Sequence, residues 1–499
     1  MIESVLRSTQ RNMLIREYCA DNFGYFNLVD TYYRSYAENA ILMFLVILTI
    51  YPLLFMCIAL IADKYLSEGM RDLAKRLALS PTLAAVTLIA FANGAPDVIN
   101  SIQSSKVKSE GMELALGALV GAFLFSSTLV MGNVLHRAHS KKLKVPTGPF
   151  LKEMGMYLFS LSLIAFQAYV GTISTLFVVT YFLMYVVYIW LSILLRERAQ
   201  EEIIGERIQE AVSGDDIENH SSEAESRMTR SSFLLRKTFW DKESNSIVNF
   251  LLFPFKILHL LTLPNEGLSN SSDNSVLFRL FVLVIKIVSS FISLFLSLTQ
   301  VFNVDLILSL KICSIVPFIY GVVMLVPALR WMNKYFVQIF CLLGSLALIN
   351  ISVGFTLDSV FIISFLIQIE RLFVIMVVVS AGNTIGDYFA NGSLADMGNE
   401  TMAFLASFSG QTFNLLVGFW FNLILRNNND FDIFGWNGKA GPTSSNVCLR
   451  LLFMFAVGSI AINTMVGVAW KFQFVKGHRT VMFFYYFIFV LVSIIFVVA

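Results

Sequence analysis

The sequence predicts an all-α polytopic membrane protein with about twelve transmembrane helices, arranged as two inverted five-helix repeats with broken helices at an ion site. Three observations lead to this prediction: an apolar composition, apolar segments long enough to cross a bilayer, and a polar motif that occurs twice within them. Of the 499 residues, 57% are hydrophobic and only 14% are charged. That leaves too few polar side chains to cover a soluble protein of this size.

The apolar segments are about 20 residues long, which at 1.5 Å per residue is enough to cross a hydrocarbon core. After an N-terminal tail (1–39), the first five-helix repeat (40–195) has spans expected near 40–61, 82–104, 114–135, 150–170 and 173–195. A polar loop (196–275) and two extra spans (276–328), near 276–298 and 306–328, come next. The second five-helix repeat (336–498) has spans expected near 336–356, 366–392, 401–425, 447–470 and 479–498.

Basic residues orient these spans, because Lys and Arg accumulate on the side from which helices are inserted. With this topology one face receives the loop 196–275 and most basic loop residues: Arg71, Lys75, Arg76, Arg137, Lys141, Lys142, Lys144, Arg330, Lys334, Lys471, Lys476 and Arg479. We expect this face to lie in the cytosol or the mitochondrial matrix, with both termini on the other side. Within the loop, a charged, Ser-rich regulatory linker is expected to precede an interfacial helix at "IVNFLLFPFKILHLLTLP".

A polar motif occurs once in each repeat. The first copy is "AFANGAPDVINS" (90–101) and the second is "SAGNTIGDYFANGSLADMG" (380–398). In each copy an Asn precedes an Asp by four residues, which places both side chains on one face of a helix. The two pairs are Asn93 with Asp97 and Asn383 with Asp387.

The span after each motif begins with small and polar residues, "GALVGAFLFSST" (117–128) and "ASFSGQTFNLLVG" (406–418), in which Ser126 and Asn414 hold corresponding places. Because seven spans, an odd number, lead from the start of the first repeat to the start of the second, the second repeat enters the membrane in the opposite orientation. Inverted repeats with broken helices place a substrate site at the midplane. Pro96 has no N–H, so we expect it to break the first motif helix and free the carbonyl of Ala92, while Gly94 allows close backbone approach.

An ionised Asp in mid-bilayer costs about 2.5–3.5 kcal/mol, so the two motif carboxylates need partners. Neither motif contains Lys or Arg, which makes a cation the expected partner. Carboxylate, amide, hydroxyl and freed carbonyl oxygens form a hard-ligand set that suits Ca²⁺, whereas zinc and copper favour imidazole or thiolate. The five cysteines lie at no metal-ligand spacing. Once Ca²⁺ leaves, closing the empty site requires Na⁺ or protons, so the charge balance predicts exchange.

These residues resemble the cation/calcium exchanger superfamily, and more narrowly its sodium/calcium/lithium exchanger branch, best known from the mitochondrial inner membrane. The resemblance rests on "NGAPD" (93–97), "GNTIGD" (382–387) and "FNLLVG" (413–418), and extends more weakly to "GYFNLVDTYY" and "FPFKILHLLTLP". It implies a transporter rather than an enzyme: an alternating-access antiporter that exchanges Ca²⁺ for Na⁺ or Li⁺. The ion-site residues it implies are Asn93, Gly94, Asp97, Ser126, Asn383, Thr384, Asp387, Gly410 and Asn414, to which the carbonyl of Ala92 freed by Pro96 is added.

Alternatives remain open at this stage. A H⁺/Ca²⁺ antiporter would use the same site, because two nearby carboxylates in a dry environment take up protons readily. A Ca²⁺-permeable channel is a more distant alternative, since channels usually need a continuous pore framed by parallel elements. The residues also leave the plasma and vacuolar membranes open. The expected partners are membrane lipid and inorganic cations; the net charge of +2 forms no basic stripe for nucleic acid. No cofactor is expected beyond the transported ions, and the oligomeric state stays open.

Overall fold

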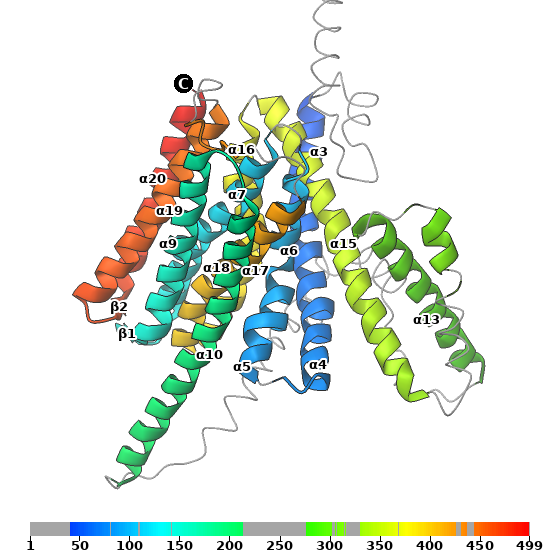
Figure 1. The fold of residues 1–499 in the computed structure, drawn as a ribbon, viewed down its shortest axis with the longest axis horizontal. Helices are drawn as coiled ribbons and strands as arrows, with labels where there is room; N and C mark the ends of the chain where they lie inside the picture. The colour runs from blue at the N-terminus through cyan, green and yellow to red at the C-terminus, as the bar shows by residue number, and fades with distance from the viewer. Residues whose placement is uncertain are drawn as a thin grey trace, which may run out of the picture.

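A computed structural model describes residues 40–79, 81–107, 110–140, 142–212, 276–301, 305, 307–313, 315, 330–367, 369–425, 431–436 and 444–498. Within these ranges the chain is an all-α polytopic membrane protein whose helices pack side by side (Figure 1). By length and composition, eight of the described helices are able to cross a membrane. The predicted count of about twelve is therefore not confirmed.

The first half of the bundle is built from long helices, several of which contain a π-helical segment. Its elements are α3 (Ala40–Leu60), η1 (Ile61–Ser67), α4 (Glu68–Arg76), α5 (Pro81–Ala84), η2 (Ala85–Ile89), α6 (Ala90–Ser104), α7 (Gly111–Phe125), η3 (Ser126–Val130), α8 (Met131–Arg137), β1 (Lys142–Lys144), α9 (Thr147–Val170) and α10 (Thr175–Val212). α9 ends at Gly171, whose left-handed φ of 79° closes the helix.

The second half has the same character. Its elements are α13 (Val276–Leu296), η5 (Ser297–Val301), α15 (Arg330–Ile367), α16 (Arg371–Val374), η7 (Ile375–Val379), α17 (Ser380–Asp396), α18 (Glu400–Leu425), α19 (Ser444–Ala469), β2 (Gln473–Val475) and α20 (Lys476–Val498).

Eleven of the predicted spans coincide with helices, and their ends show where sequence reasoning falls short. The twelfth, 306–328, lies mostly outside the described residues, as do the tail 1–39 and the expected interfacial helix. α10 continues to Val212, beyond the predicted end at 195, because its charged extension "RERAQEEIIGERIQEAV" also favours a helix. α15 runs to Ile367, eleven residues past the predicted end at 356. The predicted division into domains stays a prediction.

One end of the bundle gathers the basic loops, as the orientation analysis predicts. The short strand β1 pairs antiparallel with β2, with Leu143 opposite Phe474, and so joins two basic loops that are far apart in sequence. Arg137 forms a 2.6 Å ion pair with Asp396 at the end of α17. The guanidinium of Arg76 stacks 4.4 Å from the ring centroid of Tyr335. We refer to this end, where β1, β2 and α4 lie in the lower part of Figure 1, as the basic end.

The two motif helices run in opposite directions. α6 follows the turn after α4 at the basic end and leads away from it, whereas α17 ends at Asp396, which pairs with Arg137 at the basic end. The repeats are thus inverted, as predicted. The interruption in each helix lies elsewhere than expected: α6 continues through Pro96, and the departure from α-helical geometry is the π segment before the motif.

These π segments occupy matching places in the two repeats. η2 ends at Ile89, eight residues before Asp97, and η7 ends at Val379, eight residues before Asp387. A π turn inserts one extra residue into the hydrogen-bond ladder and commonly occurs at functional sites. Because the offset is the same in both repeats, the two carboxylates are presented by equivalent distorted helices.

Burial separates the inner helices from the outer ones. α7 is buried along nearly its whole length, and its small residues allow close packing: a Cβ on Gly121 would lie 2.5 Å from the carbonyl oxygen of Met376 in η7. By contrast, α20 exposes large apolar side chains such as Phe484, Phe487 and Ile495. An apolar outer surface of this kind suits contact with lipid.

Candidate ion-binding site

The two motif carboxylates come together in the interior, between α6 and α17. Asp97 is buried, with 8% of its surface exposed, whereas Asp387 is partly exposed. They lie close enough for the charge of Asp387 to act on Asp97. Among the ion pairs of the described residues, none involves either carboxylate. The site therefore carries two formal negative charges without a basic counter-charge, which is costly inside a membrane.

The third element of the site is α18, which places two carboxamides against the carboxylates. Asn414 donates from Nδ2 to Oδ2 of Asp97 at 2.7 Å. Gln411, one turn earlier on the same helix face, donates from Nε2 to Oδ2 of Asp387 at 3.4 Å and also interacts with Asp97. Gln411 therefore bridges the two repeats.

Sequence reasoning missed Gln411, which is 1% exposed. In the stretch "ASFSGQTFNLLVG" only the small residues and Asn414 stand out as candidates. The signal that would have identified Gln411 is its spacing: a residue three positions before Asn414 lies on the same helix face.

Three carboxamide oxygens around the carboxylates have no hydrogen-bond partner. They are Oδ1 of Asn383, Oε1 of Gln411 and Oδ1 of Asn414, each shielded from solvent. A buried carbonyl oxygen without a donor costs about 1–3 kcal/mol, so native proteins rarely leave one unpaired without a reason. Together with two carboxylates, these oxygens form a hard-ligand set that a cation would complete.

Gly94 allows α18 to approach the carboxylate helix. A Cβ at this position would lie 1.8 Å from Oδ1 and 2.9 Å from Cγ of Asn414, so no larger residue fits without moving that carboxamide. The predicted role of Gly94, close backbone approach, agrees with this packing. The partner that approaches is a side chain of the other repeat.

Other predicted site residues lie near the pair but show different contacts. Asn93 is exposed, and its Oδ1 accepts a 2.9 Å hydrogen bond from Ser67 in η1. Ser126 donates to the carbonyl of Ser407 in α18 at 2.6 Å and thus ties the two repeats together. The hydroxyl of Thr384 donates to its own helix, at the carbonyl of Ser380.

The backbone candidates differ as well. Ala92 is fully buried within the continuous helix α6, so the expected break that would open its carbonyl to a cavity is not seen. Gly410 has open space where a Cβ would stand. The structure thus gathers Asp97, Asp387, Asn383 and Asn414 with Gln411, and places the remaining candidates around them.

A second ionisable group inside the bundle also escaped the sequence analysis, which treated 150–170 as an apolar span. Lys152 and Glu153 form a 2.7 Å ion pair whose side chains are 9% and 4% exposed. Tyr188 of α10 reaches both Glu153 and the carbonyl of Ser409 in α18, at 3.4 Å each. This pair is internally neutral and connects α9 and α10 to the helix that carries Gln411.

Fold and site together define an integral membrane protein with inverted repeats that surround a buried, oxygen-lined site with two carboxylates. Comparison with known proteins agrees with this class. The family model described as "Sodium/calcium exchanger protein" matches residues 47–194. These comparisons support a resemblance to the cation/calcium exchanger superfamily.

Similar proteins include mitochondrial-type and plant members. The mitochondrial sodium/calcium exchanger protein of Mus musculus is 24% identical over 82% of this chain and 75% of its own length. Cation/calcium exchanger 5 of Arabidopsis thaliana is 25% identical over 89% of this chain and 81% of its own length. Among solved structures, the H⁺/Ca²⁺ exchanger CAX aligns over 98% of this chain and 94% of its own, with 11% identity and a TM-score of 0.42.

Proposed function

We propose that this chain is a secondary active antiporter that exchanges Ca²⁺ for Na⁺ across a membrane by alternating access. The observation that carries the proposal is the set of three unpartnered amide oxygens around two unpaired carboxylates. Two negative charges balance one Ca²⁺, and neutral amide oxygens can fill the rest of its flexible shell of 6–8 ligands.

Exchange follows from the charge of the empty site. When Ca²⁺ departs, Asp97 and Asp387 face each other uncompensated, and enclosing such a pair away from water is unfavourable. The site therefore closes only after other cations have entered. Na⁺ is the proposed counter-ion because the matched mouse protein is named a sodium/calcium exchanger, and Li⁺ is a candidate substitute.

The same geometry supports alternating access. α6 and α17 run in opposite directions and carry π segments at equal offsets from their carboxylates, so either repeat can swing about the pair in an equivalent way. Gln411 and Asn414 lie on one helix and contact a carboxylate of each repeat. Movement of α18 relative to α6 or α17 would therefore alter the ligand shell. We propose the mitochondrial inner membrane as the location, in line with the names of the mouse and rat relatives.

The test is Ca²⁺ uptake into proteoliposomes that contain the purified chain, with an outward gradient of Na⁺, Li⁺, K⁺ or H⁺ in parallel arms at controlled membrane potential. Uptake driven by Na⁺ is expected. Uptake driven only by H⁺ would replace Na⁺ with protons as the counter-ion at the same site. Flux without any counter-gradient, accompanied by single-channel currents, would contradict the antiporter and favour a channel.

A further inference from the structure

Beyond the carboxylates, α6 and α18, which pack against each other, carry further polar groups that lack partners. Asn100, Ser104 and Asn422 are at most 1% exposed. Both polar side-chain atoms of each Asn, and the hydroxyl of Ser104, have no hydrogen-bond partner. We call these three residues the outer seam. The candidate ion site likewise contains buried amide oxygens without hydrogen-bond donors. The contacts of Asp97 do not account for the unpartnered groups of the outer seam.

The outer seam lies further along α6 and α18 than the carboxylates do. It therefore lies toward the end of the bundle that is opposite the basic end. Asn414 contacts Asp97, and further along a Cβ on Gly418 would lie 3.2 Å from the hydroxyl of Ser101. Asn100 and Ser104 follow Asp97 by three and seven residues, so both lie on its helix face. Asn422 follows Gly418 by four residues and lies about 12 Å beyond Asn414 along the helix.

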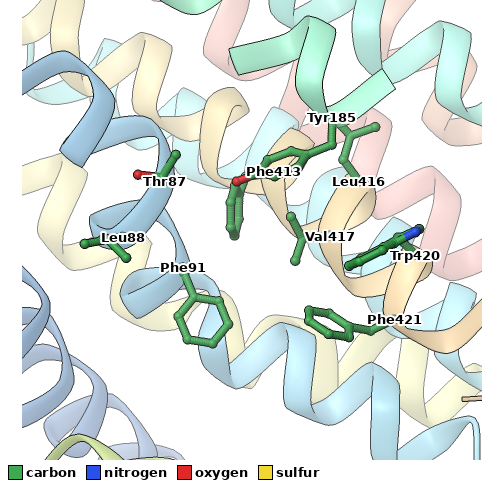
Figure 2. A pocket seen from close by; sticks show the side chains of 9 residues that line it. All are labelled: Thr87, Leu88, Phe91, Tyr185, Phe413, Leu416, Val417, Trp420 and Phe421. Atoms are coloured by element: carbon green, nitrogen blue, oxygen red, sulfur yellow. The ribbon is translucent and has the colours of Figure 1, made fainter. Parts of the chain in front are cut away.

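Another side of α18 is mostly apolar. A cavity of about 240 Å³ between α18, α10 and the start of α6 is lined by side chains such as Phe91, Phe413 and Trp420, as Figure 2 shows. Apart from the hydroxyl-bearing side chains of Thr87 and Tyr185, the lining offers a cation no oxygen ligands. Asn422, which follows Gly418 by one helical turn, is not among the residues that line this cavity.

The chemistry of the seam selects its ligand. It offers two amide oxygens and one hydroxyl oxygen, which are hard and neutral ligands. A divalent cation would stay uncompensated there, whereas a monovalent cation costs far less to desolvate. We propose that the outer seam binds a small alkali-metal cation, Na⁺ or Li⁺, at a station separate from the carboxylate pair. This station deepens the proposed antiport, on which it rests, by giving the counter-ion a binding place of its own.

The test is the thermal unfolding of the full chain in detergent, in NaCl, LiCl or N-methylglucamine chloride at equal ionic strength. It uses Asp97→Asn/Asp387→Asn as the background, so that the central site is disabled. A ligand that binds only the folded state raises the melting temperature with its concentration. We expect Na⁺ to raise the melting temperature in this background, and the rise to vanish when Asn100→Leu and Asn422→Leu are added.

A matched control replaces a buried amide whose hydrogen bonds are made. Asn463 of α19 donates to the carbonyls of Ser127 and Ser459 and pairs with His478. Asn463→Leu in the same background should lower the melting temperature yet keep the Na⁺-dependent rise. If the variant with both Leu substitutions fails to fold, Ser104→Ala is tested in its place. We expect it to reduce the Na⁺-dependent rise in melting temperature.

Two results would overturn the outer seam as a cation site. One is loss of the Na⁺-dependent rise in the Asp97→Asn/Asp387→Asn background itself, which would assign all Na⁺ binding to the carboxylates. The other is an undiminished rise in the seam variants. Failure of the antiport proposal is a separate observation, because it appears as absent Ca²⁺ flux in the wild-type chain whatever the melting temperatures show.

Discussion

The close approach of Gly94 to Asn414 makes Gly94→Ala a sensitive probe of the ion site. The added methyl group would lie 1.8 Å from Oδ1 of Asn414, an overlap that backbone adjustment alone cannot absorb. Asn414 is 2% exposed, so its carboxamide can avoid the methyl group only by turning away from Asp97. That movement removes a hydrogen bond to a carboxylate and displaces an unpartnered amide oxygen of the proposed ion site.

The magnitude follows from the interaction lost. A hydrogen bond to a charged group contributes about 1.5–3 kcal/mol, and tight overpacking adds a similar cost. If the hydrogen bond's 1.5–3 kcal/mol is lost from the free energy of ion binding, the half-saturating Ca²⁺ concentration rises about 10- to 150-fold. The assay is initial Ca²⁺ uptake into proteoliposomes over a range of Ca²⁺ concentrations, normalised to the amount of inserted protein.

Gly386→Ala is the matched control. Gly386 lies next to Asp387 in the other motif helix, but a Cβ there would have nothing within 4 Å. The substitution should leave Ca²⁺ half-saturation unchanged and stabilise the helix by about 0.5–1 kcal/mol. A half-saturating Ca²⁺ concentration of Gly94→Ala within twofold of the wild-type value would contradict a role of the Gly94–Asn414 contact in ion binding. An equally large rise of this concentration in Gly386→Ala would contradict it as well.

Three further outcomes are expected. Asp97→Asn and Asp387→Asn should each abolish Ca²⁺ uptake while the protein still reaches the membrane, and robust flux in either variant would contradict the site assignment. Gln411→Leu should raise half-saturating Ca²⁺ about 10-fold, since it removes both the bridging donor and an unpartnered oxygen; unchanged uptake would exclude Gln411 from the site. Glu400 accepts hydrogen bonds from the backbone N–H and the hydroxyl of Ser140, so Glu400→Gln should destabilise the fold by about 1.5–3 kcal/mol in thermal unfolding. The half-saturating Ca²⁺ concentration should stay unchanged. An unchanged melting temperature would contradict this.

The elements that the sequence predicts well are those set by local pattern. Apolar length locates the helices, and the repeated Asn–Asp spacing identifies both carboxylates before any geometry is known. The odd number of spans from the start of the first repeat to the start of the second predicts the inversion, which the opposite directions of α6 and α17 confirm. These features depend on composition and spacing alone, because burial in lipid requires apolar residues and complete helical hydrogen bonding.

Features that depend on packing between distant segments cannot be predicted from the sequence in this way. A π turn requires one extra residue but has no composition of its own, so η2 and η7 are invisible in the sequence. The pairing of β1 with β2 joins segments more than 300 residues apart. Asn93 matches Asn383 in sequence, yet Ser67 of a neighbouring helix holds its side chain and only Asn383 interacts with Asp97.

We propose that Asp97 and Asp387 together hold the transported Ca²⁺. Equilibrium binding of radioactive Ca²⁺ to the purified full chain tests it most directly, with each single Asn variant measured beside the wild type and its monodispersity verified. We expect one Ca²⁺ bound per wild-type chain, displaced by Na⁺, and loss of that binding in both variants. Ca²⁺ binding of unchanged affinity in either variant would contradict it.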